Sequence, residues 1–179
     1  MKDTIKEILN TSLYLLIVLV LTLCVIKYVG QRTEVSGSSM ETTLSDKDNL
    51  IVDKISYRFH DPERFDIIVF PFQYADNTYY IKRIIGLPGE TVYIDNEGSI
   101  FINGEQLEEN YGLETIADPG RASTNITLAS DEYFVMGDNR NNSSDSRTEA
   151  VGNVKRSSII GKAWVRIYPF NKICYLGDK

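Results

Sequence analysis

The chain falls into two regions that differ in how hydrophobic and polar positions alternate. Residues 13–26 read LYLLIVLVLTLCVI, an aliphatic run of 14 residues without a charge. As a helix with a rise of ~1.5 Å per residue, the run spans roughly 21 Å, short of a hydrocarbon core of ~30 Å. Extended to residues 8–29 it spans roughly 33 Å, provided that Lys27 and Tyr28 reach the interface. The pattern predicts a single membrane anchor within residues 1–30.

Two other interpretations of this segment remain open. A cleaved secretory signal also has an apolar core of this length after basic residues, here Lys2 and Lys6. However, the residues that follow, KYVGQRTE, lack the small-x-small site that such cleavage needs. A helix buried in a globular core would need a polar face, which this run lacks. The uncleaved anchor is favoured, although basic residues on both sides leave its orientation unset by the positive-inside rule.

After Thr43 the apolar positions recur with a period of two, which is typical of β-strands. The turn signals LPG at 87–89 and NG at 103–104 separate such runs, and the second predicts a tight hairpin with positive φ at both positions. We expect a mostly β fold, in which one N-terminal transmembrane helix precedes an antiparallel β-sheet or barrel domain at 31–179. The polar segment 108–127 is expected to be a surface insertion. The expected strands cover 49–55, 66–72, 78–85, 91–95, 99–102, 132–136 and 158–168.

The composition excludes several classes of function. The net charge of the 179 residues is −6, so broad nucleic-acid binding has no electrostatic support. Cys24 and Cys174 are too few for a disulfide framework. The single histidine, His60, excludes a metal site built from several histidines or from a Cys/His cluster. We therefore expect no metal, no cofactor and no nucleic-acid partner.

Three serines precede a methionine in VSGSSMETTL, residues 35–44. They form either a flexible tether behind the anchor or a loop that carries a nucleophile. A serine hydroxyl is a poor nucleophile until a neighbouring base takes its proton. His60 lies in the turn-like stretch FHDPERF and is expected to be a surface residue. The other usable base is a lysine that is kept neutral.

Lys82 is the candidate for that base. Strand alternation in TYYIKRII places Tyr80, Lys82 and Ile84 on one face. At a pKa near 10.4 only ~1 lysine in 2,500 is neutral at pH 7, a deficit of about 4.6 kcal/mol, and burial in an apolar cleft recovers most of it. On composition alone, a lysine that snorkels off a strand edge is the more common case.

A polar loop, GDNRNNSSDSR at 137–147, follows the last predicted strand but one. It is either a solvated loop held by side-chain-to-backbone bonds, or a brace for a catalytic group. In the second case a hydroxyl from Ser143 or Ser144 would orient a neutral amine. Asp145, paired with Arg140 or Arg147, would then lock the loop through charge-assisted hydrogen bonds.

These stretches, in this order behind a membrane span, resemble bacterial type I signal peptidases, the membrane-bound Ser/Lys peptidases of family S26. The matches are SGSSMETTL, RFDIIVF, YYIKRIIGLPGE and GDNRNNSSDSR, which cover most of residues 35–90 and 137–147. Residues 91–136 carry little of the resemblance and are expected to be a variable insertion.

The resemblance implies a role for each matching residue. Ser39, directly before Met40, corresponds to the nucleophile, Lys82 to its general base, and Ser143 to the hydroxyl that orients the lysine. Asp145 and Arg147 correspond to the pair that supports the loop. The scaffold of that loop would comprise Gly137, Asp138 and Asn139, and the apolar pockets for small P1 and P3 side chains would be lined by Val35, Tyr80 and Ile81.

Three positions depart from the family pattern. Some members have a serine two positions before the nucleophile that donates to the oxyanion, where this chain has Gly37. The backbone N–H of Ser39 would donate to the oxyanion, and a second donor, if present, must come from elsewhere. Thr42 stands where proline is usual and is expected to loosen the turn, and Phe65 stands where glycine is usual.

The resemblance also implies the setting and the substrate. The N-terminus would be cytoplasmic and the catalytic domain extracytoplasmic, anchored in the bacterial cell membrane. The partners would be secretory preproteins and the lipid bilayer, and cleavage would follow a small P1 residue. Two alternatives are a non-catalytic, membrane-anchored assembly factor that retains the fold, and a self-cleaving regulator, which would require a DNA-binding helix-turn-helix. Retention of Lys82 argues against the first, and the N-terminal anchor against the second.

Overall fold

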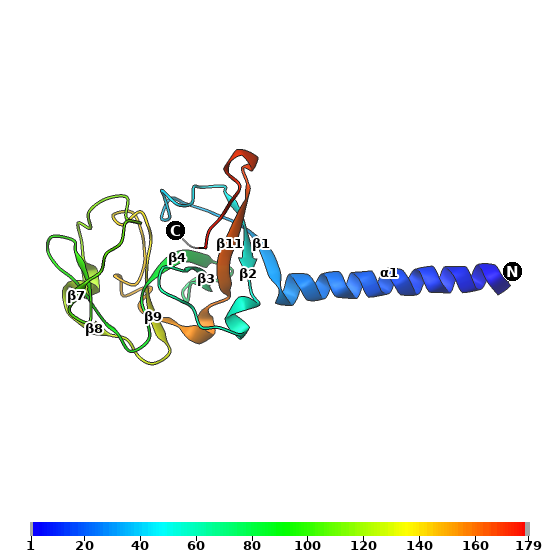
Figure 1. Ribbon diagram of the computed structural model, residues 1–179, viewed down its shortest axis with the longest axis horizontal. Helices are drawn as coiled ribbons and strands as arrows, with labels where there is room; N and C mark the ends of the chain where they lie inside the picture. Colours follow the sequence, from blue (N-terminus) through cyan, green and yellow to red (C-terminus); the bar gives the residue numbers. More distant parts are fainter. Residues whose placement is uncertain (1, 178–179) are drawn as a thin grey trace.

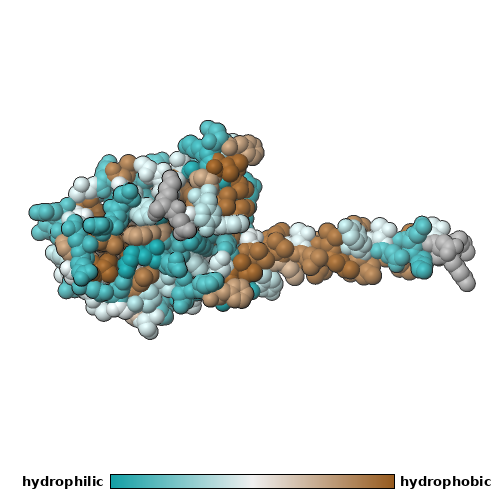
Figure 2. Space-filling view, in the orientation of Figure 1, coloured by the Kyte–Doolittle hydropathy of each residue, from teal (hydrophilic) through white to brown (hydrophobic). Residues whose placement is uncertain are grey.

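The computed structural model describes residues 2–177 and shows one long helix outside a β-sheet body (Figure 1). The helix α1, Lys2–Tyr28, projects away from the sheets. Its span Thr4–Tyr28 has 25 residues and contains an 18-residue window with a mean hydropathy of 2.4, none of which is buried by the rest of the chain. Figure 2 shows hydrophobic surface along most of its length. The prediction of one N-terminal apolar helix followed by mostly antiparallel sheets is confirmed.

A helix suits this segment because a bilayer offers no hydrogen-bond partner to backbone N–H and C=O groups, which a helix pairs internally. The hydroxyl of Thr22 donates to the carbonyl oxygen of Val18 at 2.9 Å, so this polar group is also satisfied within the helix. α1 ends beside the first strand, β1, Gly30–Glu34. α1 is therefore joined to the large sheet almost without a linker.

The large sheet has eight antiparallel strands in the order β1-β2-β11-β3-β4-β9-β10, with β12 paired to β11. β11 comes from near the C-terminus but lies between β2 and β3, so both ends of the β region share one sheet. The strands of this sheet after β1 are β2 Asn49–Asp53, β3 Ile67–Pro71, β4 Tyr79–Gly86, β9 Glu132–Met136, β10 Val154–Lys155, β11 Gly161–Tyr168 and β12 Cys174–Tyr175.

A smaller sheet of four strands, in the order β7-β6-β5-β8, lies on the side of the body away from α1 (Figure 1). The predicted hairpin turn is confirmed, because Asn103 and Gly104 both have positive φ, 53° and 88°. The segment 108–127 is mostly irregular and ends in a short 3₁₀ helix, Gly120–Ser123, and strand β8. The strands are β5 Thr91–Ile94, β6 Ile100–Ile102, β7 Glu105–Gln106 and β8 Ile126–Thr127.

Sequence periodicity missed β1 and the short strands β7, β8, β10 and β12. β1 reads GQRTE and has no alternating apolar residues. It is a strand because it pairs with β2 along its whole length, Thr33 opposite Leu50 for example. The last long strand begins at Gly161, and not at the predicted 158, because Arg156–Ser158 form a 3₁₀ turn. Tertiary pairing, and not local pattern, thus sets β1.

One buried cluster fixes the loop after β1. It is formed by Val35, Met40, Leu44, Leu50, Ile67 and Ala163. Met40 and Leu44 come from the serine-rich loop and are 1% and 0% exposed. Burying a side chain of this kind contributes about 1.5–3 kcal/mol, so the loop is held by its apolar residues. The polar residues between them remain at the surface of the domain.

The pairing of β2 with β11 leaves no space for a side chain at Gly161. A Cβ there would lie 2.2 Å from the backbone oxygen of Asp53. We predict that Gly161→Ala lowers the free energy of unfolding by about 1–3 kcal/mol, because the strands must separate. Denaturant unfolding of the full chain in detergent measures this loss. Gly30→Ala is the matched control, since its nearest neighbours lie at 3.6 Å; an equal loss in both variants would contradict the prediction.

Candidate active site

Residues 35–44 form the loop that carries the candidate nucleophile. The buried side chains of Met40 and Leu44 anchor it, and Leu44 N–H donates to Met40 O at 2.8 Å, which closes a tight turn. Gly37 has φ +96°, a left-handed conformation that glycine adopts without strain. Ser39 lies between these fixed points and is half-buried. The loop is therefore structured, and the interpretation as a flexible tether is wrong.

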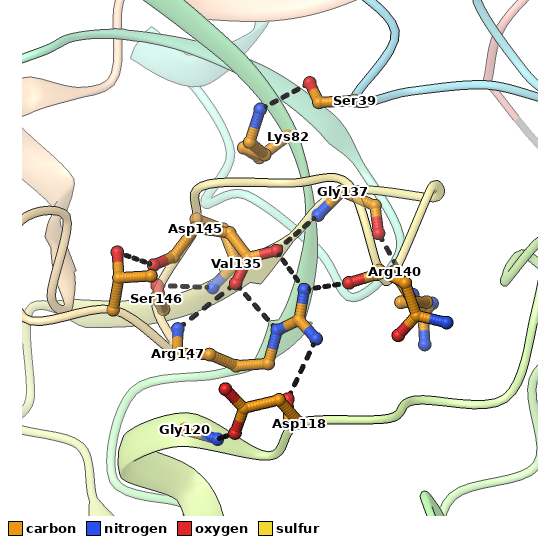
Figure 3. Close-up of polar contacts among 12 residues, drawn as sticks. Ser39, Lys82, Asp118, Gly120, Val135, Gly137, Arg140, Asp145, Ser146 and Arg147 are labelled. Carbon is orange, nitrogen blue, oxygen red and sulfur yellow. Dashed lines mark hydrogen bonds and ion pairs between the residues drawn. The ribbon is translucent and has the colours of Figure 1, made fainter.

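The structure brings Lys82 to Ser39 (Figure 3). Lys82 lies on β4 and is 3% exposed. Its Nζ donates to Ser39 Oγ at 2.7 Å and to the carbonyl oxygen of Ile81 at 3.1 Å. The amine also lies 5.0 Å from the ring centroid of Tyr80, on the same face of the strand. The alternative in which Lys82 snorkels from a strand edge into solvent is therefore wrong.

Burial lowers the pKa of Lys82 from about 10.5 to about 8. The main cause is desolvation, which disfavours the charged ammonium, and the negative charges of Asp145 and Asp138 partly oppose it. With a pKa near 8, roughly one lysine in ten is neutral at pH 7, which removes about 3 kcal/mol of the cost of deprotonation.

Asp145 is the buried centre of the polar loop 137–147 (Figure 3). It pairs with Arg147, whose Nε and Nη2 donate to the two carboxylate oxygens at 2.9 Å each. The backbone N–H of Gly137 donates to the same carboxylate at 3.1 Å. Arg140 instead pairs with Glu109 at 2.7 Å. Of the two arginines that the sequence left open, Arg147 is the partner of Asp145.

A second buried ion pair, which sequence reasoning missed, joins the polar loop 137–147 to β4. Arg83 donates to Asp138 through Nε at 2.9 Å and Nη2 at 2.7 Å. The hydroxyl of Thr43 donates to the same carboxylate at 2.5 Å. A charged residue directly after Lys82 in a strongly apolar strand was the available signal. Removing one partner of a buried pair costs about 3–5 kcal/mol, so these three residues fix how β4, the polar loop and the nucleophile loop meet.

The polar loop also holds the nucleophile loop directly. The side-chain amide of Asn139 donates to Ser38 O, and its backbone N–H donates to Ser39 O, both at 3.1 Å. Gly137 lies so close that a Cβ there would be 2.4 Å from Ser39 O and 2.3 Å from Ser143 Oγ. Only glycine fits between the two loops. The scaffold residues predicted in this loop are therefore in contact with the serine segment.

Ser143 is placed differently from its predicted role. Its Oγ is buried beside Gly137 and, among the residues that the structure describes, has no hydrogen-bond partner. The hydrogen bonds of the Lys82 amine go to Ser39 and Ile81. The role of Ser143 in orienting the lysine remains a prediction. Ser144, the other serine considered, is exposed and lines the groove described next.

Ser39 and Lys82 face a groove of about 560 Å³. One wall is the segment 33–40, which continues β1, and the other is 77–82 at the start of β4. The three residues predicted to line substrate pockets, Val35, Tyr80 and Ile81, all lie in these walls. The groove is thus bordered by the end of β1 with the loop that follows it and by the start of β4, and it contains the hydroxyl and the amine.

Phe65, one of the departures from the family pattern, has a conformational explanation. Its φ is +73°, in the region where glycine is unstrained and a bulky residue is not. The ring packs against Tyr111 with centroids 5.0 Å apart, which compensates part of the strain. Thr42 is exposed, and His60 is a surface residue in the turn after the 3₁₀ helix Ser56–Arg58, as predicted.

Comparisons with known proteins give the family. The family described as signal peptidase, peptidase S26, matches residues 8–168. The chain is similar to Signal peptidase I of Leptolyngbya laminosa, with 43% identity over 165 residues, 88% of this chain and 78% of the relative. It is also similar to Probable signal peptidase I-2 of Synechocystis sp., with 42% identity over 156 residues, 84% of this chain and 69% of the relative. Signal peptidase I S of Bacillus subtilis is 33% identical over 179 residues, covering 94% of this chain and 93% of the relative. The chain belongs to the signal peptidase I family, peptidase S26.

Proposed function

We propose that this chain is a serine endopeptidase that removes N-terminal signal peptides from exported preproteins, with Ser39 as nucleophile and neutral Lys82 as general base. One observation carries the proposal. An amine that is 3% exposed lies 2.7 Å from a serine hydroxyl at the side of an open groove. A buried lysine in contact with a hydroxyl is the arrangement that a nucleophile and its base require.

The reaction begins when Ser39 Oγ attacks the carbonyl carbon of the scissile peptide bond. Lys82 accepts the hydroxyl proton, and the carbonyl electron pair moves onto oxygen, where the backbone N–H of Ser39 donates to it. The protonated lysine then gives its proton to the leaving amine. Water hydrolyses the ester with Lys82 again as base. Ser143, buried beside Gly137, orients the amine when its hydroxyl turns towards Lys82.

The groove suits a peptide in an extended conformation. Its two walls, 33–40 and 77–82, present backbone groups along which a substrate strand can pair. Val35 is 4% exposed and Ile81 is half-buried, so apolar surface lies beside the nucleophile. Pockets bounded by Val35, Tyr80 and Ile81 would accept small side chains at P1 and P3.

The helix α1 anchors the enzyme in the membrane that also holds its substrates. We infer a cytoplasmic N-terminus and an extracytoplasmic β domain, because a signal peptide emerges for cleavage on the far side of the membrane. The short connection between α1 and β1 supports this role, since it keeps the domain at the bilayer surface. Confinement there raises the encounter rate with membrane-embedded preproteins without further contacts.

Loss of either member of the proposed dyad is predicted to abolish cleavage. Ser39→Ala and Lys82→Met should each reduce kcat/KM by roughly 10⁴-fold or more, because the two groups act as a unit. Preprotein cleavage by purified enzyme in detergent, with N-terminal analysis of the product, measures this. Ser157→Ala and Lys172→Met, on the exposed surface, are the matched controls. Full activity in either dyad variant would refute the assignment.

The rate is predicted to depend on pH through Lys82. The neutral amine is the active form, and burial sets its pKa near 8. The rate should therefore rise about tenfold per pH unit below 8 and level off above about 9. Cleavage of a preprotein between pH 5 and 10 measures this profile; a constant rate over that range would contradict a lysine base.

Close contact at Gly137 is predicted to be essential for activity. In Gly137→Ala the new Cβ pushes against Ser39 O and Ser143 Oγ, so the nucleophile moves away from Lys82. A misplacement of this kind costs about 10²-fold in kcat. Gly30→Ala, which has space for its methyl group, should keep its activity. Unchanged kcat in Gly137→Ala would show that the contact between the loops does not position the serine.

A further inference from the structure

The tetrahedral intermediate needs more than one donor, and the structure limits where the second can lie. Ser39 N–H makes no other hydrogen bond within the described part of the chain, so it is available to the oxyanion. Two positions before Ser39 is Gly37, which has no side chain to donate. Its φ of +96° also disfavours any side chain there, because an L residue would be strained. The second donor must therefore come from another residue of the groove.

Ser38 is the hydroxyl nearest in sequence to the nucleophile. Ser38, Ser39 and Lys82 line the same groove. The backbone of Ser38 is fixed, because its carbonyl oxygen accepts from the side chain of Asn139 and from the N–H of Glu41, both at 3.1 Å. The residue therefore keeps its place beside the nucleophile while the substrate reacts.

Asn142 determines what the hydroxyl of Ser38 can do. The Nδ2 of Asn142 donates to Ser38 Oγ at 2.9 Å. Within residues 2–177, the structure gives this hydroxyl no acceptor for its own proton. A hydroxyl that accepts from an amide is polarised and becomes a better donor. Asn142 also lines the groove, so the amide and the hydroxyl lie beside the space that the scissile carbonyl enters.

We propose that the hydroxyl of Ser38, oriented by Asn142, is the second donor to the oxyanion. The inference rests on the proposed function of Ser39 and Lys82. When Ser39 Oγ bonds to the carbonyl carbon, the π electron pair moves to the carbonyl oxygen and the serine proton moves to Lys82. The negative oxygen then accepts hydrogen bonds from Ser39 N–H and Ser38 Oγ–H, without further proton transfer. Ser38 is thus a catalytic residue and Asn142 a positioning residue.

Substitution of Ser38 tests the donor itself. Ser38→Ala should lower kcat by roughly 10- to 100-fold, with KM within about twofold, because the lost bond forms only in the transition state. Ser38→Thr keeps the hydroxyl and should restore most of the rate. A substrate-like peptide aldehyde, which adds to Ser39 and places an anionic oxygen in the same site, should bind Ser38→Ala more weakly by a similar factor. Binding of the cleaved product peptide should be unchanged.

Substitution of Asn142 tests the direction of its hydrogen bond. Asn142→Asp replaces the donating amide with a carboxylate that accepts the proton of Ser38, so its loss in kcat should equal or exceed that of Ser38→Ala. Asn142→Ala should lose less, since Ser38 keeps its proton but not its orientation. When Asn142→Ala is added to the Ser38→Ala variant, kcat should change little further. Asn171→Ala, on an exposed residue of the 3₁₀ helix Phe170–Lys172, is the control.

The outcomes separate this inference from the proposed function. If Ser39→Ala and Lys82→Met are inactive while Ser38→Ala retains full kcat and aldehyde affinity, the donor assignment fails and the dyad stands. If Ser38→Ala loses KM and product binding but not kcat, Ser38 contacts the substrate and not the oxyanion, and the proposal is again overturned. If the two dyad variants remain active, the proposed function fails first.

Discussion

The proposed catalysis depends on one amine that is held uncharged next to a hydroxyl. Removing Lys82 from water lowers its pKa, and the negative charges of two buried carboxylates, Asp145 and Asp138, oppose this shift. Each carboxylate carries a bidentate arginine partner, Arg147 and Arg83 respectively. The ion pairs thus hold the buried carboxylates in fixed positions, while the pKa of the nearby lysine stays near 8. The ion pairs matter more for placing the carboxylates and balancing their charge than for the free energy of folding.

The second constraint is the close approach of three chain segments. The nucleophile loop is anchored on one side by Met40 and Leu44 in the core and on the other by backbone contacts with the polar loop. Asn139 supplies two hydrogen bonds to this loop, and Gly137 approaches it so closely that no side chain fits there. Lys82 comes from β4, whose neighbour Arg83 is tied to the same polar loop through Asp138. Apolar anchoring and buried hydrogen bonds together hold the hydroxyl within bonding distance of the amine.

Sequence patterns predicted the anchor, the long strands and the hairpin at Asn103, because each depends on local periodicity or turn chemistry. They could not predict β1, which exists only through its pairing with β2. The sequence also could not show whether Lys82 is buried. Strand alternation tells which face of the strand a side chain is on, but not whether other segments cover that face. Resemblance to a known family suggested Ser39 and Lys82, and the structure places them in contact. Arg83 and the positive φ of Phe65 went unrecognised because both depend on contacts between distant segments.

A direct titration of Lys82 tests the central claim most sharply. Full-length protein in detergent micelles, labelled with ¹³C at the lysine ε carbon, would show one resonance that is lost in Lys82→Met, and its chemical shift would follow the protonation of that amine alone. The account predicts a midpoint near pH 8, well separated from the bulk of the lysines near 10.4. A midpoint above about 10 would mean that the amine stays charged at neutral pH, and the account of catalysis would be wrong.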